Sequence, residues 1–63
     1  MDLISVAGDG DILRVREFLD RGTDPNIKDN WGHTPLVYAS RRNKKEIVRL
    51  LLERGADPNI RDV

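Results

Sequence analysis

This chain of 63 residues contains no cysteine and only one residue each of methionine, tryptophan, tyrosine and phenylalanine. The absence of cysteine excludes disulfides and thiolate metal sites. No apolar run approaches the ~18 residues of a membrane-spanning helix, so we expect no membrane span. The first residues also lack the basic and long apolar regions of a secretory signal. We therefore expect a soluble cytoplasmic protein, with the nucleus as the alternative.

The chain also has a net charge of zero, because 11 basic residues balance 11 acidic ones. A balanced chain has no overall field that would attract nucleic acid or anionic lipid. The charges are nevertheless unevenly placed. Residues 1–11 carry acidic side chains without a basic one, whereas residues 41–49 carry Arg41, Arg42, Lys44, Lys45 and Arg49 against Glu46. We expect the molecule to be electrically polar from end to end.

An internal repeat is the most informative feature that is present. Segment 21–29 (RGTDPNIKD) returns as 54–62 (RGADPNIRD), 33 residues later (54 − 21), and the copies differ only at Thr23/Ala56 and Lys28/Arg61. A period of this length is typical of stacked-repeat proteins, in which each unit buries its apolar face against its neighbours. Such stacks expose long surfaces and few enclosed pockets. Binding of another macromolecule is therefore the expected kind of function.

Apolar spacing predicts two helices in the first third of the chain. Residues 2–8 form the first, which we expect to be broken around Asp9 by Gly8 and Gly10. Asp11 is a suitable N-cap for a second helix over 12–21. One face of this helix is predicted to be buried, since apolar residues recur at helical spacing: Ile12, Val15, Phe18 and Leu19.

Two more helices are predicted in the second half. Threonine and proline at 34 and 35 supply an N-cap oxygen and a favourable first helical residue, and Leu36, Tyr38 and Ala39 are expected to face inward. A fourth helix covers 44–54, with Asn43 and Glu46 interpreted as its capping pair. Between the helical halves, residues 23–33 are bracketed by turn signals and predict an extended finger. Asp24, and Asp57 at the equivalent position, should bond to nearby backbone N–H groups.

The segments 32–40 (GHTPLVYAS) and 47–59 (IVRLLLERGADPN) closely resemble the ankyrin repeat. The resemblance implies an all-α ankyrin-repeat solenoid, with two antiparallel helix pairs joined by a β-hairpin finger. It divides the chain into an N-terminal capping helix pair (1–22), a full repeat (23–55) and the start of a further finger (56–63). It also implies a non-catalytic scaffold that binds a protein partner. Val37 and Asn43-Lys44 depart from the histidine and Gly-His that the family usually has there.

Partner-contacting positions in the ankyrin family lie on the finger tips and the inner helices. Carried over to this sequence, they are Asn30, Trp31, His33, Arg41 and Arg42, with Arg54 as a weaker candidate. We expect Trp31, with the two arginines of the helix end, to form the centre of the recognition surface. The alternative for Trp31 is a structural one, in which its ring lies across Ile27 and Ile60 of neighbouring fingers.

The family also contains finger asparagines that are hydroxylated, a position that Asn26 and Asn59 occupy. We favour a structural role for both, through hydrogen bonds inside the turn. Residues 41–45 invite a nucleic-acid interpretation, but they lack interleaved aromatic residues and suit a helix end and a solvated loop. No metal site, cofactor loop or nucleophile is expected, because His33 is the single histidine and no glycine-rich phosphate loop occurs.

The broad stripe Leu50-Leu51-Leu52 raises the question of what covers it. Two helix pairs are fewer than the three or so units that a stable stack needs, and large apolar patches seldom stay uncovered. Three explanations remain open: a fragment of a longer array, a homo-oligomer formed through this side, or a marginal monomer. A minimal, truncated or engineered repeat, whose main property is folding and self-assembly, is the alternative function.

Overall fold

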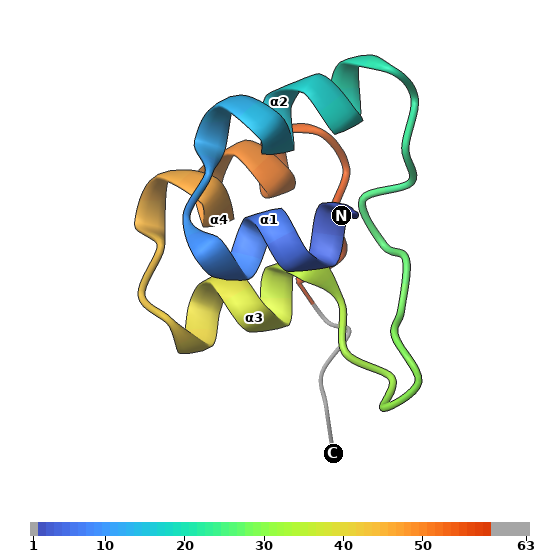
Figure 1. Cartoon of the computed structure of the whole chain (residues 1–63), viewed down its shortest axis with the longest axis vertical. Coiled ribbons are helices and arrows are strands. Elements are labelled where there is room, and N and C mark those ends of the chain that lie inside the picture. The colour runs from blue at the N-terminus through green and yellow to red at the C-terminus, as the bar shows by residue number, and fades with distance from the viewer. Residues whose placement is uncertain (1, 59–63) are drawn as a thin grey trace.

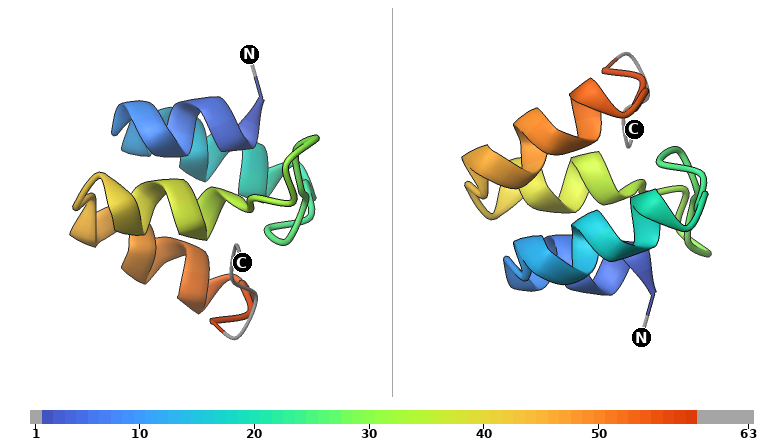
Figure 2. Two further views of the ribbon diagram at one scale, coloured as in Figure 1. Left: turned by 90° about the horizontal axis from the view of Figure 1, so that it is seen from below. Right: turned by 90° about the horizontal axis from the view of Figure 1, so that it is seen from above.

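A computed structural model describes residues 2–58 of the chain. This part consists of four helices joined by loops: α1 (Leu3–Asp9), α2 (Ile12–Asp20), α3 (Pro35–Arg41) and α4 (Lys45–Glu53). Helices α1 and α2 form one antiparallel pair and α3 and α4 another (Figure 1). The pairs stack so that α1 lies beside α3 and α2 beside α4, as Figure 2 shows from two sides. The all-helical prediction is confirmed for the described residues.

Local capping explains where the first three helices begin. The side chains of Asp2 and Asp11 accept hydrogen bonds from the backbone N–H groups of Ser5 and Arg14, at 2.9 Å and 3.2 Å. At α3, the buried hydroxyl of Thr34 accepts from the backbone N–H of Val37 at 3.3 Å. Each bond satisfies a donor that the first helical turn leaves unpaired. The caps predicted at positions 11 and 34 are therefore confirmed.

The end of α1 differs from the prediction, because the helix continues through Gly8 and ends at Gly10. Gly10 has the left-handed φ of 84°, and its N–H bonds to the carbonyl groups of Val6 and Ala7. Gly8 remains helical, and its carbonyl accepts a hydrogen bond from Arg42, described below. The prediction that Gly8 breaks the helix was wrong.

The connection between α3 and α4 also corrects the prediction. Asn43 has a φ of 60°, and its N–H bonds to the carbonyl of Ser40 at the end of α3. The N-cap of α4 is Lys44, which makes no side-chain capping bond, so the predicted capping pair of Asn43 and Glu46 does not form. Asn43 instead terminates α3, because asparagine tolerates left-handed backbone better than most residues. It occupies the position that Gly10 holds in the first repeat.

One buried apolar cluster joins the two helix pairs. Leu3 and Val15 of the first pair and Leu51 of the second are its largest fully buried apolar residues. The three consecutive leucines of α4 behave differently: Leu50 and Leu51 are buried, and Leu52 is 41% exposed. Successive residues of an α-helix point about 100° apart, so one helix cannot bury three in a row equally. The expected solvent-facing stripe is thus reduced to Leu52, flanked by the half-buried Val48.

The connection between the pairs, residues 23–34, is an irregular loop that runs along one end of the helices (Figure 1). None of its residues is in a β-strand, so the expected β-hairpin is not seen here. Two backbone bonds of 3.0 Å close its tip, one from the N–H of Asp29 to the carbonyl of His33 and one from the N–H of Gly32 to the carbonyl of Asp29. The turn predicted at Asp24 is confirmed, since its Oδ1 accepts from the N–H of Asn26 at 2.9 Å. Within residues 2–58, no helix is long and apolar enough to cross a membrane.

Candidate functional site

A shallow groove of about 280 Å³ runs between the two inner helices, α1 and α3. Its α1 wall is largely acidic or small, whereas α3 contributes one aromatic and one cationic side chain. The lining residues are Asp2, Ile4, Ser5, Gly8, Asp9, Tyr38 and Arg42. Opposite charges therefore face one another across a surface that is open to solvent. Such a surface suits contact with a polar macromolecular partner better than enclosure of a small ligand.

Gly8 lies where α1 meets α3. A Cβ atom at this position would lie 3.5 Å from Nη1 of Arg42 and 3.6 Å from Cβ of Tyr38. These are ordinary contact distances, so a small side chain would also fit here and the approach of α3 does not require glycine. Nη1 of Arg42 donates to the carbonyl of Gly8 at 3.3 Å. The arginine at the end of α3 is thus held over the groove by the neighbouring repeat.

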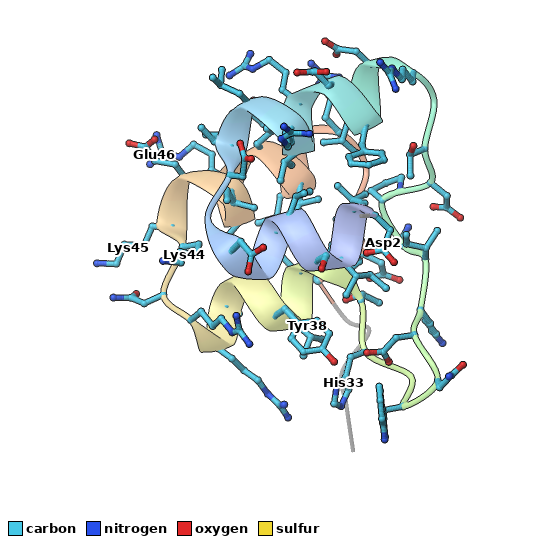
Figure 3. All side chains as sticks on the ribbon, viewed as in Figure 1. Asp2, His33, Tyr38, Lys44, Lys45 and Glu46 are labelled. Carbon is cyan, nitrogen blue, oxygen red and sulfur yellow. The ribbon has the colours of Figure 1, made fainter. Side chains whose placement is uncertain are left out.

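A second group of polar residues ties the loop tip to α3. Oδ1 of Asp29 accepts from the backbone N–H groups of Trp31 and His33, both at 2.9 Å. Oδ2 of the same carboxylate accepts from the Tyr38 hydroxyl at 2.5 Å. One aspartate therefore fixes the backbone on both sides of the tip and anchors it to the helix. Figure 3 shows the Tyr38 and His33 side chains lying toward one another below α3.

The tautomer of His33 follows from this network. Nδ1 of His33 lies 3.1 Å from the Tyr38 oxygen, and the two rings meet edge to face with centroids 5.3 Å apart. The Tyr38 hydroxyl has one proton, which it donates to Asp29. Its oxygen can then only accept from His33, so Nδ1 carries a proton. His33 is therefore a hydrogen-bonding residue of the loop tip.

Trp31 lies at the tip with its backbone held and its side chain exposed. Its N–H is bound by Asp29, yet 76% of the residue is accessible to solvent. The alternative, in which the ring lies across neighbouring fingers, does not fit this exposure for Ile27, and Ile60 lies outside the described residues. Asn30 is exposed beside it. The indole is therefore a large apolar group on a locally fixed backbone.

The three predicted arginines occupy different places. Arg41, the last residue of α3, and Arg42 lie at the end of that helix away from the loop tip. Trp31 precedes the start of α3, so a helix of seven residues, about 10 Å long, separates it from the arginine pair. Arg54 follows α4 and donates from Nη1 to Oδ1 of Asp20 at 2.7 Å, joining the two outer helices. His33 thus lies beside Tyr38 at the groove, whereas Arg54 lies at the outer helices, where it is bonded to Asp20.

The family description "Ankyrin repeats (3 copies)" matches residues 3–62. This chain belongs to the ankyrin-repeat family. A 2-5A-dependent ribonuclease from Mus musculus is 45% identical over 50 residues, which are 78% of this chain and 7% of that protein. Ankyrin repeat domain-containing protein 46 from Rattus norvegicus is 40% identical over 49 residues, 78% of this chain and 22% of that protein. The chain therefore spans less than a quarter of the length of these relatives.

A viral relative is similar over a shorter stretch. Putative ankyrin repeat protein L92 from Acanthamoeba polyphaga mimivirus is 46% identical over 37 residues, 59% of this chain and 9% of that protein. Ankyrin repeats generally mediate protein–protein interaction and are generally non-catalytic modules. The similarity to the ribonuclease covers a small part of that enzyme, so its activity does not transfer to this ankyrin-repeat chain.

Sequence reasoning missed Asp29 as the organising residue of the finger, and expected Tyr38 to face the core. Tyr38 is half-buried, and its hydroxyl reaches out to the carboxylate of the loop. The missed signal is the run Asp29-Asn-Trp-Gly32, since an aspartate at the start of a turn commonly accepts from backbone N–H groups beyond it. The acidic groove residues Asp2 and Asp9 were noted only as part of the uneven charge.

We predict that Tyr38→Phe raises the pKa of Asp29 toward its ordinary value of about 3.9. The Tyr38 hydrogen bond is the main cause of the lowered pKa of Asp29, partly offset by desolvation, and the same bond raises the pKa of Tyr38. A lowered carboxyl pKa means that this interaction stabilises the loop above pH about 4 and is lost as the pH falls through the Asp29 pKa. The raised tyrosine pKa means that the interaction is also lost as the pH rises through the Tyr38 pKa.

An NMR titration of the Asp29 carboxyl carbon measures this shift. His33→Ala is the matched control, because it removes the ring beside Tyr38 but leaves the bond from Tyr38 to Asp29. We expect its Asp29 pKa to stay closer to that of the unmodified chain than the Tyr38→Phe value does. An unchanged Asp29 pKa in Tyr38→Phe would contradict the assignment.

Proposed function

We propose that this chain is a protein-binding module that presents its loop tip and the end of its inner helix α3 to a protein partner. The loop tip contributes Asn30, Trp31 and His33, and the helix end contributes Arg41 and Arg42. The exposed indole of Trp31 carries the proposal. Tryptophan dominates many interfaces because it buries a large area at little cost in side-chain entropy.

The network around Asp29 supports this role. Hydrogen bonds from the backbone N–H groups of Trp31 and His33 to the Asp29 carboxylate limit the motion of the tip before a partner arrives. Less ordering entropy is then lost on binding. The groove between α1 and α3 continues this surface with both signs of charge, so a partner with complementary charges would gain association rate and specificity.

Several finer assignments belong to the same proposal. The loop 23–34 acts as the projecting finger, and the chain divides into a capping pair (1–22), a full repeat (23–55) and the start of a further finger (56–63). Arg54 is the weakest contact candidate, because its guanidinium is engaged with Asp20. The cytoplasmic location stays a prediction.

Affinity capture with matched variants tests the proposal. We expect the immobilised chain to retain a protein that Trp31→Ala loses, with an affinity for the purified partner reduced about 30-fold, as for interface hot spots. Leu13→Ala is the control, because Leu13 is also large and exposed, at 70%, but belongs to the outer helix α2. Equal retention by the chain and by Trp31→Ala would refute the role of the tip. It would favour a repeat whose main property is folding and assembly.

A further inference from the structure

The outward side of the second helix pair repeats a surface that the first pair keeps covered. Ala7, Val15 and Leu19 of the first pair are buried in the same cluster as Leu50 and Leu51 of α4. The residues one repeat length (33) after Ala7, Val15 and Leu19 are Ser40, Val48 and Leu52. Of these, Ser40 and Leu52 are exposed and Val48 is half-buried. The second helix pair therefore exposes the side that, on the first helix pair, is covered by a complete helix pair.

This side also carries three exposed cations. They are Arg41, Lys45 and Arg49, the equivalents of Gly8, Ile12 and Arg16. In the first pair those three positions face the second pair. Gly8 lies against Arg42, and Ile12 and Arg16 line a groove with four residues of α4: Glu46, Arg49, Leu50 and Glu53. We call the surface formed by Arg41, Lys45, Val48, Arg49 and Leu52 the trailing face.

The opposite side of the molecule is its acidic counterpart. The α3 and α4 residues that meet the first pair include Arg42, Glu46 and Leu50, and their equivalents one repeat earlier are Asp9, Leu13 and Glu17. All three are exposed, and Leu13 is 70% accessible. We call Asp9, Leu13 and Glu17 the leading face. The nearby Arg14 is paired with Asp11 at 3.2 Å, which reduces its repulsion of an approaching cation.

If the contacts between the two helix pairs are repeated one repeat later, the trailing face of one molecule meets the leading face of a second copy. The contact between Gly8 and Arg42 becomes one between Arg41 and Asp9 of a second copy. The groove that Ile12 and Arg16 line with α4 becomes one that Lys45 and Arg49 line with residues of that copy: Leu13, Arg16, Glu17 and Asp20. The three cations of the trailing face then meet Asp9, Glu17 and Asp20, with Arg16 as a like charge among them. Leu13 adds apolar area to a face that already exposes Leu52.

We propose that a second copy of this chain docks its leading face on the trailing face, in the geometry that the two helix pairs share within the molecule. The two faces differ, so this contact is head-to-tail and leaves one face of each kind uncovered at the ends. Association of this type continues into open chains unless the rotation closes a ring. A symmetric pair of trailing faces would instead place three cations against three.

Sedimentation of the 63-residue chain over a range of concentrations is the first test. We expect the average mass to rise with concentration beyond that of a dimer, and to fall when salt screens the charges. A monomer at every concentration up to millimolar would overturn the proposal. It would leave the trailing face to a further helix pair of the same fold.

Two double variants then test the trailing face and the leading face one at a time. Arg49→Glu with Leu52→Glu blocks the trailing face, and Leu13→Gln with Glu17→Gln removes the leading face. All four side chains are exposed, so both variants should keep the helical circular dichroism of the parent. We expect each to be monomeric alone, and their mixture to form a 1:1 heterodimer from the one intact face of each. Self-association of either variant alone at parental strength, or a mixture that stays monomeric, would overturn the head-to-tail contact. Lys28→Gln is the control and should associate like the parent, because Lys28 is an exposed loop residue that belongs to neither face.

Discussion

Replacing Leu51 with alanine is expected to leave this chain largely unfolded, whereas the same change at Leu52 leaves it folded. Leu51 is fully buried and Leu52 is 41% exposed. Truncation of a buried leucine costs about 2–5 kcal/mol, and a domain of this size has a margin of only about 3–5 kcal/mol. The cost at Leu52 should be about 1 kcal/mol, because much of its surface is already in water.

Urea unfolding followed by circular dichroism compares the two variants directly. Because the pair has the same chemistry, adjacent positions and the same helix, helix propensity cancels between them. The expected result is a lost or strongly shifted transition for Leu51→Ala and a small shift for Leu52→Ala. Similar midpoints for both would contradict the packing described for α4. The measurement should be made at low concentration, where self-association through Leu52 contributes little.

The second large effect is expected at Asn26, where alanine should destabilise the chain by about 2 kcal/mol. The Asn26 amide links the two repeats: its Nδ2 donates to the carbonyl of Gly55 at 3.3 Å, and its Oδ1 accepts from the N–H of Asp57 at 2.8 Å. Each such bond contributes about 0.5–1.5 kcal/mol. Losing both also leaves two backbone groups of the second turn without their side-chain partner.

Asn30→Ala is the matched control for this experiment. Asn30 has the same side chain and lies in the same loop, but it is exposed near the tip, so its replacement should change the unfolding free energy by less than about 0.5 kcal/mol. Equal effects of the two substitutions would show that the Asn26 bridge contributes nothing particular. The Asn26 side chain has a structural role, but its two bonds join it to the second turn at Gly55 and Asp57 and do not lie inside its own turn as expected. Asn59 lies outside the described residues.

Much of the fold was predictable because its signals are local. Helix starts depend on one side chain reaching a backbone N–H three residues ahead, so Asp11 and Thr34 were recognisable from sequence. Asn43 shows the limit of this reasoning. Asparagine serves both as an N-cap and as a left-handed residue, and only the path of the chain after α3 selects the second role.

The candidate site was predictable in part for the same reason. The tip residues Trp31 and His33 were found from the repeat pattern, since they fall at a turn that the motif places. The bond between Asp29 and Tyr38 was not found, because it joins a loop to a helix nine residues later. The grouping of Trp31 with Arg41 and Arg42 as one recognition surface stays a prediction, and the seven residues of α3 lie between the tryptophan and the arginine pair.

The sequence by itself determined the repeat, the four helices, most of their caps and membership of the ankyrin family, because each depends on residue order within one repeat. The tertiary structure alone decided that Arg42 bonds to the carbonyl of Gly8, that Leu52 is the leucine left exposed, and that Asp29 anchors the finger through Tyr38. These features depend on how closely one helix pair approaches the next. That distance is set by packing between repeats, and no pattern within a single repeat contains it.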